Sequence, residues 1–247
     1  HLLNDRANSD CVFQNFAIPG FSTDQEALLL EREVIPLRPD RVVLVVSLSN
    51  DLFDNQFPFP IQANRAKPYF ELVANALELK HTPVPQLLKP PEEATHTLTS
   101  LVLGPDANRG LLGQLIDGSA LLAQFASVLT SEPDYRGKFE SRFAPMLELF
   151  LHILDRISKT CREGRADLQV VLLSARSFVE EPKSTSAQYQ DFLRQKIREG
   201  CQKNGWNVVD LAQTLQEKHA VEKRRWYFLH DGHLNPDGHR VVAECLA

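Results

Sequence analysis

Three apolar runs constrain the fold of this chain more than any other feature of its sequence. They cover residues 42–46 (VVLVV), 168–173 (LQVVLL) and 206–211 (WNVVDL). A continuous β-branched run such as the first is typical of a strand that is covered on both faces. Strands of that kind belong to parallel sheets, whose connections are usually helices. The sequence therefore predicts a buried parallel sheet.

Helical patterns lie between these runs. Ser22 or Thr23 offers an N-cap, with Gln25 or Glu26 as its capping-box partner, for a helix that the prolines after residue 35 stop. Alternating strands and helices predict a doubly wound α/β fold. Further helices are expected over 144–162, 187–203 and 236–247, and a short strand over 11–17 that ends at a Pro-Gly turn.

The stretch from 56 to 135 interrupts the alternation. Most of the prolines lie in its first part, and residues 69–73 and 77–79 predict a hairpin that stands off the main sheet. Residues 107–130 have the apolar spacing of a lid or cap helix. We therefore expect a single domain over 1–247 with an insert at about 56–135, and 247 residues are enough to bury its core.

Charge and apolar content exclude two classes of partner. The net charge is −5 and the basic residues are scattered, so the footprint of a nucleic-acid binder is absent. No apolar run reaches 18 residues, so no membrane span is predicted. The four cysteines are far apart and are expected to be buried or free. The compartment, cytoplasm or cell envelope, stays open, because an N-terminal signal could have been removed before His1.

Polar residues with catalytic potential follow predicted strands at three places. Gly20 closes the turn after residues 11–17, Asn50 follows the run 42–46, and Asp231 and His233 lie on the loop before the last helix. Ligands of parallel sheets bind at the carboxyl ends of the strands. A backbone N–H at a glycine turn, a side-chain amide and an Asp/His pair would supply the oxyanion donors and the oriented base of an acyl-transfer site.

Each of these residues also has an ordinary structural interpretation. Gly20 is of the kind that closes turns, Asn50 could be a turn or helix cap, and an Asp-x-His pair arises by chance in polar loops. The functional interpretation rests on their joint placement after different strands. In it, Asp231 would hold one imidazole nitrogen of His233 and leave the other free as general base.

Three segments resemble the sequence blocks of SGNH/GDSL-type hydrolases. Residues 16–25 (FAIPGFSTDQ) resemble the second block, residues 49–51 (SND) the third, and residues 231–239 (DGHLNPDGH) the last. Residues 67–70 (KPYF) together with 83–85 (PVP) resemble a segment of the bacterial branch of the family. The resemblance covers nearly the whole chain.

The resemblance implies a fold and a function. The fold would be flavodoxin-like, a three-layer α/β/α arrangement with a mostly parallel sheet. Gly20 and Asn50 would be the oxyanion-hole donors, His233 the general base and Asp231 its orienting acid. The substrate would be a small-molecule or carbohydrate ester, an O-acyl or carboxylic ester, hydrolysed by a Ser-His-Asp triad without a cofactor or metal.

Two departures from the family pattern matter. Ser49 stands where the family usually has Gly, which leaves the Asn donor in place. The first block, a strand ending in Gly-Asp-Ser, has no counterpart, because residues 1–10 (HLLNDRANSD) hold neither an apolar strand nor that turn. In a 2-1-3-4-5 sheet this first strand is central. We therefore expect a fragment of a longer protein, truncated at the N-terminus, that lacks the nucleophile and is inactive alone.

No serine of the chain is an obvious substitute nucleophile. Ser22 is expected to cap a helix, and Ser47 and Ser49 lie beside Asn50 on the oxyanion side. Ser174 follows a predicted strand at the correct edge of the sheet, yet it lacks a sharp elbow. We therefore assign the nucleophile to none of them.

Two other functions fit parts of the sequence. A non-catalytic carbohydrate- or partner-binding module that lost its nucleophile would account for the missing Gly-Asp-Ser. A metal-dependent phosphoesterase would use His230, Asp231, His233 and His239 as ligands, although the rest of the chain offers no second cluster to complete an oxygen-rich site. The identity of the ester and the oligomeric state are not determined by the sequence.

Overall fold

The central sheet follows from the three apolar runs. The computed structural model describes residues 12–61, 63–89, 136–229 and 232–246. Its main sheet has three parallel strands in the order β1-β4-β5, and β1 and β4 end level with one another. Each of the three apolar runs forms a strand, and the last strand is shorter than expected because a helix begins at residue 211. The strands are β1 (Arg41–Ser47), β4 (Asp167–Leu173) and β5 (Asn207–Asp210).

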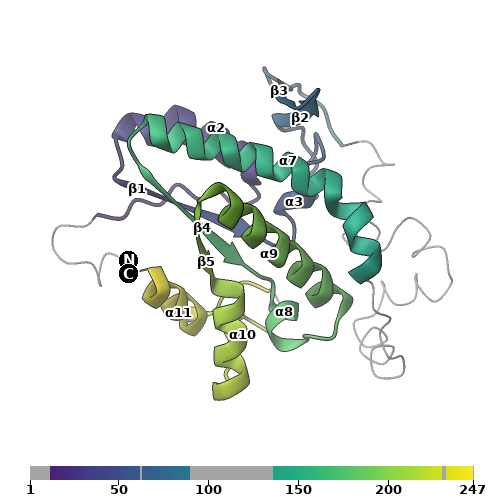
Figure 1. Ribbon diagram of the computed structural model, residues 1–247, viewed down its shortest axis with the longest axis vertical. Helices are drawn as coiled ribbons and strands as arrows, with labels where there is room; N and C mark the ends of the chain where they lie inside the picture. The colour runs from purple at the N-terminus through teal and green to yellow at the C-terminus, as the bar shows by residue number, and fades with distance from the viewer. Residues whose placement is uncertain (1–11, 62, 90–135, 230–231, 247) are drawn as a thin grey trace.

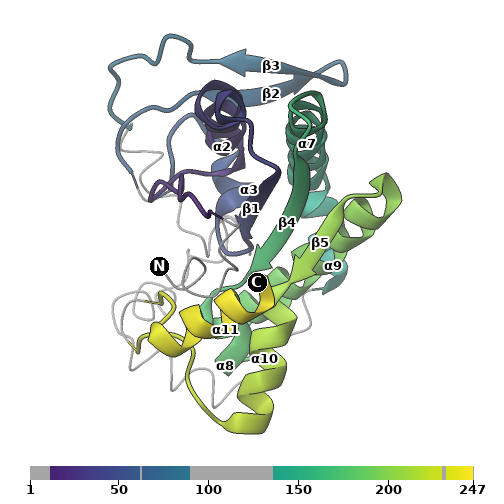
Figure 2. The same ribbon diagram turned by 90° about the vertical axis from the view of Figure 1, so that its left-hand side faces the viewer.

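Helices cover both faces of this sheet. The long helices α7 and α9 pack against each other and over β4 and β5 (Figure 1). Seen from the side, they lie on one side of the sheet and α11 lies on the other (Figure 2). The three-layer α/β class with a parallel sheet is therefore confirmed. The helices that build these layers are α2 (Thr23–Leu29), α7 (Arg136–Glu163), α9 (Thr185–Asn204), α10 (Leu211–Glu222) and α11 (Pro236–Leu246).

Two short helices follow strands directly. They are α3 (Asp51–Asp54) after β1 and α8 (Arg176–Glu180) after β4. An aromatic cluster holds α3 against the long helices, since the ring of Phe53 lies 5.7 Å from Phe143 of α7 and 5.8 Å from Tyr189 of α9. Both contacts are edge-to-face, the geometry that the ring quadrupoles favour. The segment after β1 is therefore fixed by the core beneath it.

The predicted hairpin is present and separate from the main sheet. Strands β2 (Tyr69–Val73) and β3 (Ala76–Lys80) pair only with each other, in antiparallel register. Their turn residues Ala74 and Asn75 both have positive φ, 48° and 63°, as a tight two-residue hairpin turn requires. In Figure 2 the hairpin crosses above α2 and α7, and β2 contacts both helices.

The expected strand over 11–17 was wrong for the residues that the structure describes. Residues 12–18 are irregular, and Val12 is 81% exposed. The bond from the Ala17 N–H to Asn15 Oδ1, at 2.9 Å, is local. A strand needs a neighbour for its backbone groups, and residues 12–18 pair with none of the described strands.

Two other expectations need correction or lie outside the description. Ser22 does precede α2, but its hydroxyl donates to Asp24 Oδ1 instead of capping the helix, and the expected capping box does not form. Helix α10 was not predicted from the sequence. The predicted lid helix at 107–130 lies outside the described residues, so the proposed insert stays a prediction. No helix in the described part of the chain is long and apolar enough to cross a membrane.

Candidate active site

The loop after β1 and the loop before α11 meet at the carboxyl edge of the sheet. The β1–β4 ladder continues past β1, because the Leu48 N–H bonds the Leu173 carbonyl at 2.8 Å. The next residue on β4's side, Ser174, accepts a bond at 2.8 Å from the Tyr227 hydroxyl through its carbonyl. Tyr227 in turn forms a β-bridge with Leu234, beside His233. The structure thus brings the segments of Asn50 and His233 to the same edge.

The His233 loop is anchored through its backbone. The Phe228 N–H bonds the His233 carbonyl at 2.8 Å, and the Asn235 N–H bonds the Trp226 carbonyl at 2.9 Å. The buried Trp226 indole donates to the Leu215 carbonyl at 3.0 Å, which fastens the loop to α10. The side chain of His233 itself is exposed. Its predicted partner Asp231 lies outside the described residues, so that pairing stays a prediction.

Gly20 lies in the turn that the sequence predicted. The Phe21 N–H bonds the Ile18 carbonyl at 3.1 Å, and Gly20 has φ of +82°, a conformation that favours glycine. Among the described residues, no acceptor takes the N–H of Gly20. The turn accounts for the glycine, and the exposed N–H stays available as a donor.

Asn50 is the N-cap residue of α3, but its side chain does not cap the helix. Its amide Nδ2 donates to Asp54 Oδ2 at 3.0 Å, and its Oδ1 lies 2.8 Å from Ser47 Oγ and 2.9 Å from Ser49 Oγ. Asn50 thus occupies the turn and N-cap position of its ordinary structural interpretation, although its side chain makes no capping bond. The carboxamide is held by neighbouring side chains at both ends.

Beneath Asn50 lies a group of charged and polar side chains that the sequence analysis did not single out. We call it the buried polar cluster, and each member is at most 3% exposed. Lys67 forms an ion pair with Asp24, and Asn55 Oδ1 accepts the Asp24 N–H at 3.1 Å. The cluster thereby ties the second-block segment to α3. Its members are Asp24, Asp51, Asp54, Asn55 and Lys67.

Burial governs the ionisation of this region. Desolvation raises the pKa of Asp51 well above its ordinary value, and the nearby Glu26, Asp54 and Asp24 charges add to that effect. Desolvation also raises the pKa of Glu26 to about 8, with Asp24 contributing. Burial raises the pKa of Asp24 and lowers that of Lys67, while their mutual attraction opposes both shifts. With a pKa of about 8, Glu26 is largely protonated at neutral pH in the folded protein.

The serines considered as substitute nucleophiles have other partners. Ser22 is fully buried and donates to Asp24, and Ser47 and Ser49 face the Asn50 carboxamide. Ser174 is buried, and its hydroxyl lies 3.4 Å from that of Tyr227. Each of these hydroxyls thus has a partner among the described residues, and the assignment of the nucleophile to none of them stays a prediction.

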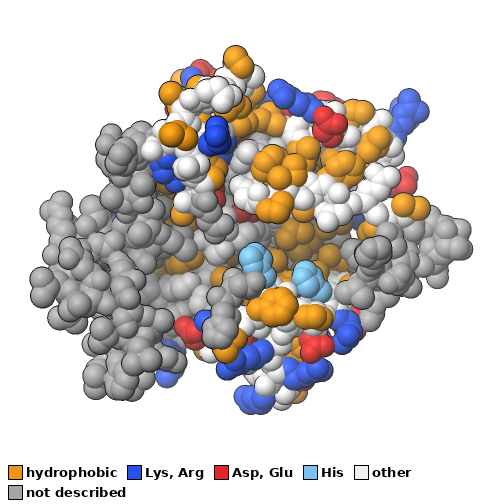
Figure 3. Space-filling view, turned by 180° about the vertical axis from the view of Figure 1, so that it is seen from behind, with side chains coloured by type: hydrophobic (Ala, Val, Ile, Leu, Met, Phe, Trp, Pro, Cys, Tyr) orange, Lys and Arg blue, Asp and Glu red, His pale blue; other side chains and the backbone are white. Residues whose placement is uncertain are grey.

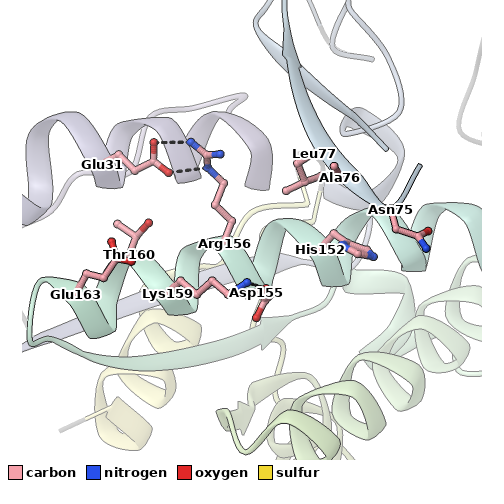
Figure 4. Close-up of a pocket in the computed structure, with 10 residues that line it drawn as sticks. All are labelled: Glu31, Asn75, Ala76, Leu77, His152, Asp155, Arg156, Lys159, Thr160 and Glu163. Atoms are coloured by element: carbon pink, nitrogen blue, oxygen red, sulfur yellow. Dashed lines mark hydrogen bonds and ion pairs between the residues drawn. The ribbon is translucent and has the colours of Figure 1, made fainter. Parts of the chain in front are cut away.

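A groove of about 620 Å³ lies elsewhere on the molecule. It is bordered by α7, by the tip of the hairpin and by Glu31, in the helical segment that continues α2. Figure 4 shows Arg156 of α7 crossing it to Glu31, with bonds of 2.7 and 2.9 Å. Its charged groups largely neutralise one another, since Lys159 also pairs with Asp155. None of the predicted site residues lines this groove, so it gives no support to a catalytic role there.

The surface beside the His233 loop is partly apolar. Phe228 and Leu229 are each 48% exposed, immediately before the two residues that are not described. Figure 3 shows histidine side chains at the surface of the face seen from behind, next to hydrophobic side chains. An exposed imidazole beside apolar surface suits contact with an uncharged organic substrate.

A metal centre has no support in the described part of the chain. Within it, no group of three or more His, Cys, Asp and Glu side chains could hold a metal ion. Of the four ligands expected for a metal-dependent phosphoesterase, His233 and His239 are exposed. His230 and Asp231 lie outside the described residues, so that alternative is not tested by the geometry.

The fold and these contacts can now be set beside known proteins. A profile of the GDSL-like Lipase/Acylhydrolase family matches residues 1–241. The chain belongs to this family. No curated protein matched the sequence. Membership in the GDSL-like family supports an esterase or other hydrolase activity and agrees with the three-layer fold. The individual roles of Gly20, Asn50, Asp231 and His233 stay predictions.

Three members of the buried polar cluster carry a signal in the sequence. Asp24 lies in the segment that resembles the second block, and Lys67 begins the KPYF segment. Both segments were recognised, but nothing in the sequence indicated that they pair with each other. Asp54 carries a local signal, since it lies four residues after Asn50, one helical turn away.

Proposed function

We propose that this chain carries the oxyanion donors and the acid–base pair of a serine ester hydrolase. Family membership supports hydrolysis of an ester, and the contact of Tyr227 with the Ser174 carbonyl supports a shared site for the Asn50 and His233 segments. That contact is the observation that carries the proposal, because it fastens a loop 53 residues away in sequence to the edge where β1 ends.

In the proposed reaction, a serine encoded before His1 attacks the ester carbonyl. His233 takes the serine proton, and Asp231 orients the imidazole and stabilises its charged form. The N–H of Gly20 and the second N–H of Asn50 donate hydrogen bonds to the carbonyl oxygen as it becomes negatively charged. The alcohol leaves with the proton from His233, and water then releases the acid from the acyl-enzyme by the same steps.

The open edge of β1 is consistent with a nucleophile outside the described strands. In a 2-1-3-4-5 sheet, strand 1 lies beside strand 3, and the observed order β1-β4-β5 matches strands 3-4-5. The printed sequence contains no Gly-Asp-Ser. Residues 1–247 by themselves are therefore proposed to be inactive.

The test uses the protein expressed from the complete gene. A fluorophosphonate probe should label a serine encoded upstream of His1, and His233→Ala should lower kcat/KM on p-nitrophenyl acetate by about 10³-fold or more. His239→Ala is the matched control, because His239 is also exposed and lies six residues further on, and it should retain activity.

Three outcomes would contradict this proposal. Absence of labelling, with activity unchanged in His233→Ala, would exclude the triad. Loss of activity in His239→Ala together with sensitivity to EDTA would favour the metal-dependent phosphoesterase. A complete gene without an upstream Gly-Asp-Ser, and without any hydrolysis, would favour the non-catalytic binding module.

A further inference from the structure

The carboxamide of Asn50 is restrained by three side chains, which we call the amide clamp. Asp54 Oδ2 accepts from Asn50 Nδ2 at 3.0 Å. Ser47 Oγ and Ser49 Oγ lie 2.8 and 2.9 Å from Asn50 Oδ1 and 2.9 Å from each other. The two hydroxyl hydrogens are therefore shared among three oxygens, and both ends of the carboxamide have partners.

The clamp determines which end of the carboxamide faces Asp54. An ionised carboxylate only accepts hydrogen bonds, so it requires the amide nitrogen of Asn50 and would repel its oxygen. A half-turn of the carboxamide would place its oxygen against the Asp54 carboxylate and lose that bond. Ser47 and Ser49 could turn their hydroxyls to accept from the nitrogen, so Asp54 selects the orientation. An amide nitrogen carries two hydrogens, and no other described residue accepts from Nδ2. One N–H of Asn50 is thus held by Asp54, and the other is left for a ligand.

Asp54 is itself fixed from behind. Its Oδ1 accepts the Ile61 N–H at 2.6 Å, and the side chain is 2% exposed. The charge of Asp54 also acts to raise the pKa of Lys67. A charge-assisted bond from such an anchored carboxylate is a stronger restraint than a bond to solvent.

We propose that Asp54 is a positioning residue for ester hydrolysis, which directs the second N–H of Asn50 at the developing oxyanion. Ser49, at the position where the family usually has Gly, adds a restraint on the oxygen end together with Ser47. The inference rests on the proposed function. Oxyanion donors are effective only at about 2.7–3.1 Å from the charge, so the orientation of the donor matters as much as its presence.

The first experiment replaces Asp54 by Asn in the protein from the complete gene. An amide offers one acceptor oxygen to the two N–H groups of Ile61 and Asn50, so one of them loses its bond. We expect kcat on p-nitrophenyl acetate to fall about 10- to 100-fold, with KM changed by less than about 3-fold. Asp155→Asn, on an exposed part of α7, is the control and should leave both constants unchanged.

A matched pair at Ser49 tests the other end of the clamp. Ser49→Ala removes the hydroxyl and should lower kcat about 3- to 10-fold, whereas Ser49→Thr keeps a hydroxyl and should retain kcat. Ser49 is only half-buried, so both variants are expected to fold even if Asp54→Asn does not. Equal kcat values for the alanine and threonine variants would show that the Ser49 hydroxyl does not restrain Asn50.

A readout without catalysis separates the clamp from the proposed function. In ¹⁵N-labelled protein, the two side-chain amide protons of Asn50, assigned with Asn50→Asp, should differ widely in chemical shift. In Asp54→Asn the difference between their shifts should become smaller. An active wild type whose kcat and Asn50 shifts are both unchanged by Asp54→Asn would overturn the clamp. A wild type without esterase activity, whose Asn50 shifts do respond, would reject the proposed function and leave Asp54 as a structural partner only.

Discussion

The two sides of the candidate site are built by opposite means. The Asn50 side stands on the buried polar cluster, in which Asp24 and Lys67 pair at 0% and 3% side-chain exposure. The His233 side is held by backbone bonds and by the rings of Trp226 and Tyr227, and the histidine itself is exposed. One side is organised by buried charges and the other by neutral anchors.

This difference follows from what each side has to do. A donor such as Asn50 must keep one orientation throughout the reaction, and a fixed polar surrounding supplies that at the cost of desolvated charges. A general base must exchange its proton, so its imidazole has to reach substrate and solvent. The comparison therefore predicts that charge substitutions affect the Asn50 side far more than the His233 side.

The largest effect is expected for Lys67→Met. The substitution leaves the Asp24 carboxylate buried without its cation, which costs about 3–5 kcal/mol when a buried pair is broken. We expect urea unfolding at pH 7 to report a loss of that size. The loss should shrink on acidification, because a protonated Asp24 no longer needs a cation.

Lys80→Met is the control for this prediction. Lys80 forms exposed ion pairs with Glu71 and Glu78 of the hairpin, and solvent screens such pairs, so we expect little change in stability. The double variant Asp24→Asn with Lys67→Met should be less destabilised than Lys67→Met alone. Equal losses for the Lys67 and Lys80 variants would show that the buried cluster does not depend on its ion pair.

A smaller effect with a defined pH dependence is expected for Glu26→Gln. Burial raises the pKa of Glu26 to about 8, from an ordinary value of 4.5. The folded protein thus binds a proton that the unfolded chain has lost between these values, so the contribution to stability is full below pH 4.5 and is lost as the pH rises through 8. At pH 8 we expect Glu26→Gln to be more stable than the wild type, because the neutral amide avoids a buried charge.

Denaturant unfolding from pH 5 to pH 8 measures this. The wild-type free energy of unfolding should fall across the range, and the fall should be smaller in Glu26→Gln. A slope will persist in the variant, because Asp24 and Asp51 also have raised pKa values. Glu33→Gln, on the exposed side of the same helical segment, should follow the wild-type curve; if Glu26→Gln does so too, Glu26 is ionised in the fold.

Sequence periodicity predicted the sheet, the hairpin and the helices α2, α7, α9 and α11, because those patterns reflect which faces are buried. It failed for residues 11–17, where an apolar run has no neighbouring strand among those described. It also missed α10, whose start at Leu211 continues directly from β5 without a turn. Pairing partners and abrupt strand-to-helix junctions are tertiary properties that a local pattern does not contain.

The candidate site divides in the same way. Asn50 was selected as a polar residue just after a strand, and Gly20 and His233 were selected from local motifs, although no described strand ends directly before either of these two. The pairing of Asp24 with Lys67 joins residues 43 apart, and the contact of Tyr227 with Ser174 joins residues 53 apart. Only the folded chain reveals contacts of that span, since neither residue alone indicates its partner.

The smallest of these effects is expected on the His233 side, for Tyr227→Phe. The hydroxyl is buried, its pKa is raised to about 12 by burial, and it donates to the Ser174 carbonyl at 2.8 Å. Its removal leaves that carbonyl without this donor, which costs about 1 kcal/mol, while the ring stays in the core. Because the bond fastens the loop to the sheet edge, the Phe228 N–H should also exchange faster with deuterium. Tyr69→Phe, whose hydroxyl bonds the exposed Glu71, should change neither quantity. A loss for Tyr227→Phe as large as that for Lys67→Met would contradict the contrast between charged and neutral anchoring.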